Sequence, residues 1–161
     1  MSVQTGIGYD CHRLAGGRKL VLGGIEIPYD RGLAGHSDAD VLTHAIIDAL
    51  LGAAALGDIG EHFPDSDPRF KGCNSIELLK ETVTLLSGRG HAIEHVDATV
   101  LIEQPQLAPF KDRMRGRLAE ALGVATEQVS VKATRGEGMG FVGTGEGAAA
   151  LAVATVSSPD G

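Results

Sequence analysis

The sequence predicts an α+β fold in which helices pack on one face of a mixed β-sheet, and three observations support this prediction. The 161 residues are enough for one core, so residues 1–161 are expected to form a single domain. Segments with strand periodicity and segments with helix periodicity follow one another in the order β-β-α-α-β-α-β-β. No repeat, linker or low-complexity tail interrupts this order, which is typical of one layer of helices on a sheet.

The first two strands are expected near the N-terminus. Residues 3–14 are predicted to form one strand. Residues 19–29 are predicted to form a strand that is interrupted by a turn at Gly23 and Gly24, because paired glycines mark tight turns.

A long helix is predicted next. Ser37 is expected to be its N-cap and Asp40 a carboxylate in its first turn, because both residue types suit the start of a helix. Alanine, leucine and isoleucine then continue to a stop near Gly57. Residues 61–74 hold two prolines among Asp, Ser and Gly, which predicts a loop.

The second helix is predicted to start with a capping box. Asn74 and Glu77 have the required spacing. The apolar residues Leu79, Val83 and Leu86 follow at helical intervals, and glycines mark the end of the helix.

The rest of the chain, from residue 95 on, supplies one more helix and three strands. Residues 95–105 alternate as a strand does, and residues 109–123 have apolar side chains at four-residue intervals, which indicates a helix. Residues 128–134 and 148–156 are predicted to be the last two strands.

The composition excludes several classes of protein. The net charge is −7 and the basic residues are scattered, so no basic surface for nucleic acid or an anionic membrane is expected. Cys11 and Cys73 are the only cysteines and do not suggest a disulfide framework, which favours a reducing compartment. The sequence shows no signal-peptide pattern and no apolar stretch of membrane-spanning length. A cytoplasmic location is therefore expected.

The segment GYDCH contains a candidate pair of metal ligands. In a strand, Asp10 and His12 would lie on one face, about 6.6 Å apart along the chain, while Cys11 would point the other way. A carboxylate and an imidazole suit Zn²⁺, which takes four ligands, so a third protein ligand would leave one position open for catalysis. Taken alone, the pair also fits a surface strand whose polar residues only face water.

His44 is the candidate third ligand. It stands at four-residue intervals with His36 and Asp40, so a helix starting near Ser37 would place all three on one side. Asp48, one turn further on, is in position to hold the second ring nitrogen. The neighbours of His44 are apolar, so a core histidine with satisfied hydrogen bonds is the alternative.

A glycine-rich segment near the C-terminus contains the pattern GxGxxG at Gly138, Gly140 and Gly143. A dinucleotide-binding fold is rejected, because the segment leads into a β-rich run and lacks the acidic residue that binds ribose.

The preceding segment, KATRGE, is a candidate phosphate site. It places Lys132, Thr134, Arg135 and Glu137 at the end of a strand. Backbone amides and basic side chains there suit phosphate oxygens, and Glu137 suits Mg²⁺ bound through a phosphate bridge. A charged turn without a ligand is the alternative.

Read in order, GYDCH, HSDADVLTH, GDIGEHFPDSDPRFKG, KATRGE and GFVGTGEG resemble the motifs of the 2-C-methyl-D-erythritol 2,4-cyclodiphosphate synthase family of the non-mevalonate isoprenoid pathway. The resemblance covers almost the whole chain. It implies a homotrimer with active sites between subunits, and a phosphorus–oxygen lyase that converts 4-diphosphocytidyl-2-C-methyl-D-erythritol 2-phosphate into the cyclic diphosphate and CMP. The 2-phosphate of the substrate would attack the β-phosphorus, so positioning and charge neutralisation would suffice.

The resemblance also implies two metal ions. Asp10, His12 and His44 would bind zinc, and Glu137 would bind Mg²⁺ or Mn²⁺ that bridges the diphosphate. Divalent cations would let an acidic protein hold an anionic substrate.

Further residues match substrate contacts of the family. His36 and Ser37 match phosphate contacts, and Asp10 and His12 would also lie beside the substrate. Catalytic roles would fall to His36, Thr134 and Arg135. The methylerythritol pocket would contain Asp58, Ile59, Gly60, Phe63, Pro64, Asp65, Ser66 and Asp67. The cytidine side would contain the segment 102–108, with Ile102, Pro105, Leu107 and Ala108 as contacts, and Thr134. Its surroundings would contain Lys132, Arg135, Gly136, Glu137 and Phe141.

Three positions depart from the usual family pattern. Arg135 stands where a second threonine is common, and we expect its guanidinium to contact the diphosphate in place of the hydroxyl. Gln106 stands where lysine is frequent. Thr144 stands where arginine is common, in a region that faces the trimer axis in the family, so weak or absent binding of isoprenoid diphosphates is expected there.

Two other functions are considered. A zinc-dependent phosphohydrolase would use the same three ligands to hold a metal-bound hydroxide and would release inorganic phosphate. A non-catalytic nucleotide-binding trimer would have lost turnover through the changes at Gln106, Arg135 and Thr144.

Overall fold

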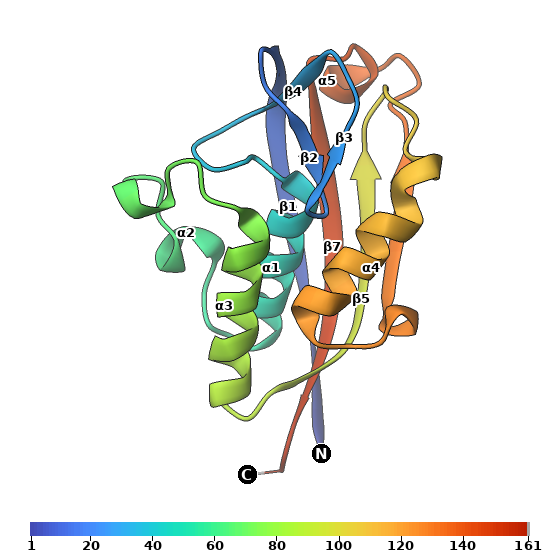
Figure 1. The fold of residues 1–161 in the computed structure, drawn as a ribbon. Coiled ribbons are helices and arrows are strands. Elements are labelled where there is room, and N and C mark those ends of the chain that lie inside the picture. The colour runs from blue at the N-terminus through green and yellow to red at the C-terminus, as the bar shows by residue number, and fades with distance from the viewer. Residues whose placement is uncertain (161) are drawn as a thin grey trace.

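The structure is a computed structural model that describes residues 1–160, and it shows a β-sheet with helices on one face (Figure 1). Both termini lie at the same end of the sheet (Figure 1). The elements in chain order are β1 (Ser2–Gly16), β2 (Leu20–Leu22), β3 (Ile25–Ile27), β4 (Arg31–Ala34), α1 (Val41–Ala53), α2 (Ile59–His62), η1 (Pro68–Phe70), α3 (Ser75–Gly88), β5 (Ala92–Leu101), η2 (Ala108–Phe110), α4 (Lys111–Leu122), η3 (Thr126–Gln128), β6 (Val129–Thr134), α5 (Gly140–Gly143) and β7 (Gly147–Ser158).

The main sheet is mixed, as predicted. Its five strands have the order β4-β1-β7-β5-β6, and β2 and β3 form a separate hairpin. Only β5 and β6 are parallel, and the other neighbours are antiparallel. The longest ladder joins β1 to β7, from the pair Ser2↔Ser158 to the pair Arg13↔Gly147. Successive residues of β1 therefore face opposite sides of the sheet.

Helix α1 lies directly on β1, and glycines in the strand allow this close approach. A Cβ atom at Gly8 would stand 1.9 Å from the carbonyl oxygen of Ala45, and one at Gly6 would stand 2.1 Å from that of Ala49. Any larger residue would collide with the helix backbone. The distance between the strand and the helix is therefore set by backbone contact.

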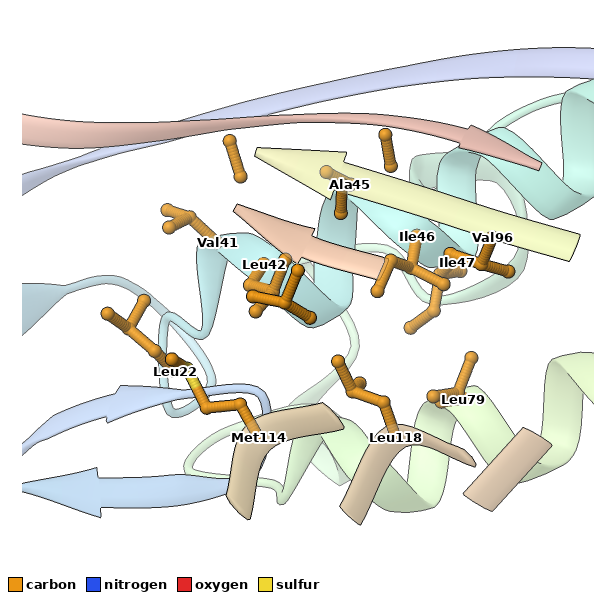
Figure 2. Packing of buried hydrophobic residues seen from close by; sticks show 14 of the residues in the cluster. Leu22, Val41, Leu42, Ala45, Ile46, Ile47, Leu79, Val96, Met114 and Leu118 are labelled. Carbon is orange, nitrogen blue, oxygen red and sulfur yellow. The ribbon is translucent and has the colours of Figure 1, made fainter. Parts of the chain in front are cut away.

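The hydrophobic core lies between the sheet and the three long helices. It is built from aliphatic residues of all these elements, as the scarcity of aromatic residues requires. Figure 2 shows Leu42 and Ile46 of α1 on the side of the core that Leu118 of α4 and Leu79 of α3 face. These four side chains have no exposed surface. Helix α1 is thus enclosed by the sheet and the other helices.

The start of α1 differs from the prediction, because Asp40 and not Ser37 is the N-cap. The Asp40 carboxylate accepts hydrogen bonds from the backbone N–H groups of Thr43, Gly23 and Gly24 at 3.0, 2.9 and 2.8 Å. Complete burial raises the pKa of Asp40 above its usual value. This carboxylate therefore joins the turn of the β2-β3 hairpin to the first turn of α1, and the helix cannot begin before it.

Several other boundaries also differ. Helix α1 ends at Ala53 and not near Gly57, and the segment predicted as a loop contains the end of α2 and the short helix η1. Strand β4 and helix α5 were not predicted. The turn between β2 and β3 and the cap of α3 by Asn74 are confirmed, since the Asn74 side chain accepts from Ile76 N–H at 2.9 Å. Among residues 1–160, no helix is long and apolar enough to span a membrane.

Candidate metal centre and substrate cavities

Strand β1 and helix α1 bring the three predicted zinc ligands together. Oδ2 of Asp10 lies 3.1 Å from Nε2 of His12 and 3.0 Å from Nδ1 of His44. One ligand atom from each of the three residues lies within 4.8 Å of the other two. The same-face prediction for Asp10 and His12 is therefore confirmed, and α1 supplies the third side chain.

These three residues fit a zinc ion. Zinc bonds of 2.0–2.2 Å in a tetrahedron place neighbouring ligand atoms about 3.3 Å apart, close to the separations around Asp10. One carboxylate and two imidazoles make a ligand set of the catalytic type, with a fourth position left for another ligand. The cluster also lines a cavity, so a ligand in that cavity has access to the fourth position.

The Asp10 carboxylate and the protonated ring of His44 stabilise each other. Burial disfavours the ionised form of Asp10, but hydrogen bonds from His12 and His44 outweigh it and lower the pKa of Asp10 to about 2. Burial also disfavours the charged form of His44, but the Asp10 carboxylate outweighs it and raises the pKa of His44. In the metal-free protein, Asp10 thus behaves as a partly buried negative charge that attracts cations.

The second ring nitrogen of His44 has partners that the sequence did not reveal. Nε2 lies 2.7 Å from Oγ of Ser75 and 3.2 Å from Oγ of Ser37. The prediction that Asp48 holds this nitrogen is wrong, because its carboxylate accepts from Ile59 N–H at 3.0 Å. Ser75 belongs to α3, so only the packing of α3 beside α1 brings it here.

His36 is not on the helix, so the predicted series of three side chains along one helix face is wrong. Its Nε2 lies 3.3 Å from the carbonyl oxygen of Asp67. His36 nevertheless lines the same cavity as the metal cluster. The loop before α1 places it there.

A cavity of about 270 Å³ opens beside the metal cluster. The predicted residues that line it are Asp10, His12, His36, Ser37, His44, Ile59, Gly60, Phe63, Pro64 and Asp65. Three further lining residues, Phe70, Cys73 and Leu78, were not predicted. Their positions depend on how η1 and α3 pack, which leaves no sequence motif.

Three residues predicted for the same pocket do not line it. Asp58 caps α2 by accepting from Glu61 N–H at 3.0 Å, and Ser66 is exposed. Asp67 caps η1 and pairs with Arg69 at 2.6 Å, and its hydrogen bonds with Arg69 lower its pKa. In a single chain these side chains support the cavity wall or face solvent.

A second hollow of about 200 Å³ lies at the end of β5 and β6. The predicted residues that line it are Ile102, Pro105, Leu107, Ala108, Thr134 and Arg135, together with Gln106. Glu103 also lines it and falls within residues 102–108, which the resemblance assigns to the cytidine side, whereas Lys111 and Ala133 line it and were not predicted. Lys132 does not line it, since its Nζ pairs with Oδ2 of Asp97 at 3.0 Å.

Glu103 holds the loop that follows β6. Its Oε1 accepts from Arg135 Nη2 at 2.9 Å, and its Oε2 accepts from Gly136 N–H at 3.1 Å. Burial opposes the ionised form, but these contacts lower the pKa of Glu103 overall. The next residue, Glu137, is exposed and has a left-handed backbone with φ of 53°.

Within one chain, Glu137 is not part of the Asp10, His12 and His44 cluster. The two hollows share no lining residue. Phe141 lines a third hollow of about 220 Å³, which also includes His12. The predicted site is therefore divided over separate surfaces of a single chain.

The fold and the cluster define a class: a small α+β protein with an Asp-His-His group suited to hold a metal ion, beside a cavity. The family model described as the YgbB family matches residues 3–157. The chain belongs to this family, whose curated relatives here are named as cyclodiphosphate synthases.

A relative from Alkaliphilus oremlandii, named 2-C-methyl-D-erythritol 2,4-cyclodiphosphate synthase, is 56% identical over 96% of this chain and 98% of its own. Among solved structures, the bifunctional IspDF from Campylobacter jejuni is 41% identical with a TM-score of 0.95, over 99% of this chain and 43% of that one. A CDP-bound 2C-methyl-D-erythritol-2,4-cyclodiphosphate synthase is 34% identical with a TM-score of 0.88, over 96% of this chain and 100% of that one.

Proposed function

We propose that this protein converts 4-diphosphocytidyl-2-C-methyl-D-erythritol 2-phosphate into 2-C-methyl-D-erythritol 2,4-cyclodiphosphate and releases CMP. The observation that carries the proposal is the cluster of Asp10, His12 and His44 beside a cavity of about 270 Å³. The high identity to named synthases over nearly the whole chain supports the same reaction. The reaction is a step in non-mevalonate isoprenoid biosynthesis.

The three clustered side chains would hold zinc. When bound, zinc would orient one phosphate group and polarise its phosphorus. The protein then has to place the 2-phosphate oxygen in line with the β-phosphorus and the leaving CMP. His36 and Ser37 line the cavity next to the cluster and are suited to hold phosphate oxygens. No side-chain nucleophile is required.

The nucleotide end would bind in the second hollow. Leu107 and Ala108 give it apolar surface, and Thr134, Lys111 and Arg135 give it polar groups at one side. One of the solved structures of relatives is a CDP-bound form, which supports a cytidine nucleotide as the ligand. Glu137 would bind Mg²⁺ or Mn²⁺ across the diphosphate, since hard oxygen ligands suit these ions.

Arg135 would contribute charge in place of a threonine hydroxyl. Its guanidinium is already bound to Glu103, so the side chain is oriented before the nucleotide arrives. Arginine keeps donors free after one such pair and is suited to phosphate oxygens. Arg135 would therefore contact the diphosphate, with Glu103 as its support.

The complete site would form between subunits of a homotrimer. The face of the sheet away from the helices exposes Ile7 (71%), Tyr9 (52%), Leu151 (41%) and Val153 (41%). These side chains are neighbours, because Ile7 pairs with Val153 and Tyr9 with Leu151 in the ladder. Such a contiguous apolar patch suits a subunit interface. Assembly would also bring the zinc cavity of one chain near the nucleotide hollow of another.

Two finer expectations belong to the same proposal. Thr144 donates its hydroxyl to the carbonyl oxygen of Gly140 at 2.8 Å and offers no cation to a diphosphate at the trimer axis. Weak or absent binding of isoprenoid diphosphates is therefore expected there.

The location would be the cytoplasm, in keeping with an acidic chain whose two cysteines are both free.

One assay tests the reaction. The purified protein is incubated with 4-diphosphocytidyl-2-C-methyl-D-erythritol 2-phosphate and Mg²⁺. The release of CMP, cyclic diphosphate and inorganic phosphate is followed with and without a chelator. CMP together with the cyclic diphosphate, lost on chelation, is the expected result. Inorganic phosphate would instead indicate the phosphohydrolase, and nucleotide binding without turnover would indicate the non-catalytic trimer.

A further inference from the structure

Nε2 of His44 contacts Ser75, and Ser75 in turn is bound to Asp38. Neither Ser75 nor Asp38 has a role in the proposed reaction. Nδ1 of His44 faces Asp10, so it is the nitrogen available to a metal in the cluster. Nε2 faces the other way and lies 2.7 Å from Oγ of Ser75. A metal takes the lone pair of Nδ1, which leaves the ring proton on Nε2.

The position of Ser75 is fixed by Asp38. Ser75 is the first residue of α3 and is completely buried. Its backbone N–H donates to Oδ2 of Asp38 at 2.9 Å, and its hydroxyl donates to Oδ1 of the same carboxylate. The backbone N–H of Asp40 also donates to Asp38 Oδ1, at 3.2 Å. The carboxylate is therefore held from α1 and α3 at once.

These bonds determine which way the proton of the Ser75 hydroxyl points. A hydroxyl has one proton, and an ionised carboxylate can only accept. The Ser75 proton therefore goes to Asp38, and the Ser75 oxygen can only accept from His44. This arrangement favours a proton on Nε2 of His44 and leaves Nδ1 free to bind a metal.

The other nearby hydroxyl is less suited to this role. Oγ of Ser37 lies 3.2 Å from Nε2 of His44 and also accepts from Ala39 N–H at 3.3 Å. Both distances are longer than the 2.7 Å contact of Ser75. Ser37 also lines the cavity, so its own proton remains available to a ligand there.

We infer that Ser75 and Asp38 form a hydroxyl–carboxylate relay that holds the proton of His44 on Nε2 and so strengthens zinc binding through Nδ1. Both are positioning residues, because they act through His44. The inference rests on the proposed zinc site and deepens it. Outer partners of metal-bound histidines commonly change metal affinity about 10–100-fold when removed.

The test compares Ser75→Ala with Ser157→Ala. Ser157 is also a buried serine whose hydroxyl donates to a carboxylate, that of Glu94, and it pairs with Val3 near the far end of the β1-β7 ladder. It therefore controls for the loss of a buried hydroxyl. The zinc dissociation constant is measured by competition with a chromophoric chelator. It should rise about 10–100-fold in Ser75→Ala and stay within about twofold in Ser157→Ala.

A second measurement needs only the unaltered protein. In its zinc-loaded form, the ¹⁵N shifts of the His44 ring report which nitrogen carries the proton. A proton on Nε2 that exchanges slowly is expected, and its exchange should become faster in Ser75→Ala. A proton on Nδ1 would overturn the relay, even if Ser75→Ala failed to fold.

The outcomes separate the relay from the zinc site. If the unaltered protein binds zinc and Ser75→Ala binds it equally well, the relay is wrong and the zinc site stands. If the unaltered protein binds no zinc, the proposed metal centre itself is wrong, and the relay falls with it.

Discussion

The guanidinium of Arg135 lies 2.9 Å from the carboxylate of Glu103, where β5 and β6 end beside the candidate nucleotide hollow. This pair fixes the position of the Arg135 guanidinium at the wall of the hollow. Its role is open to a direct test.

Replacing Arg135 by Thr should weaken binding of CDP about tenfold or more, because a hydrogen bond to a charged group contributes about 1.5–3 kcal/mol. Isothermal titration calorimetry with CDP and Mg²⁺ measures this change. Arg89→Thr, an exposed arginine at the end of α3, is the matched control and should bind normally. Unchanged CDP affinity and unchanged turnover in Arg135→Thr would refute a contact with the diphosphate.

Loss of a ligand from the metal cluster should remove zinc and activity together. Asp10→Asn or His12→Ala should each lower zinc content to background, measured by atomic emission, and abolish CMP release. The reason is that three ligands are the minimum found in catalytic zinc sites. Asp112→Asn, an exposed carboxylate of α4, should keep both properties. Full zinc content in Asp10→Asn would show that the ligand assignment is incorrect.

The gain in melting temperature on adding zinc should shrink as the pH falls from about 8.5 to about 6. Burial disfavours the charged form of His44, but Asp10 more than compensates and raises its pKa above 6.5. Protonation of His44 therefore stabilises the metal-free fold at low pH, and this contribution is lost as the pH rises through the raised pKa. Zinc requires the neutral imidazole, so its contribution has the opposite trend. Differential scanning calorimetry measures the gain in melting temperature, and an equal gain at both pH values would contradict the raised pKa of His44.

Gly8→Ala should destabilise the fold by about 1–3 kcal/mol or more, because the new methyl group would overlap the Ala45 carbonyl of α1. It should also weaken zinc binding, since Ala45 follows His44. Urea unfolding gives the free energy of unfolding. Gly88→Ala has no atom within 4 Å of its new Cβ and should be neutral or stabilising by up to about 1 kcal/mol. Similar stabilities for the two variants would show that α1 can move away from β1.

Ile7→Asp should dissociate the trimer, because an unpaired carboxylate is expensive to bury in an apolar interface. Sedimentation velocity should report monomers, and CMP release should fall with them if the site lies between subunits. Thr84→Asp, on the exposed side of α3, introduces the same charge and should leave the assembly intact. A trimeric Ile7→Asp would place the interface elsewhere.

The sequence was most informative where a local pattern decides the structure. The strand that carries Asp10 and His12 and the cap of α3 at Asn74 could be read in this way. Asp40 could not, because its role depends on the β2-β3 hairpin turn that reaches it from residues 23–24. The role of Ser75 beside His44 and the role of Glu103 beside Arg135 were missed for the same reason. Ser75 and Glu103 each contact a residue at least 31 positions away in the chain. The residues next to them in sequence do not predict these contacts.

The alternation along β1 places candidate metal ligands on one face of the strand and candidate interface residues on the other. Even-numbered residues such as Asp10 and His12 face the helices, and odd-numbered residues such as Ile7 and Tyr9 face outward. A deletion or insertion of a single residue before position 10 that shifted the register would turn the ligands outward and the apolar side chains inward. Metal binding and subunit assembly would then fail in one event, so the spacing of this strand is less open to change than any one of its side chains.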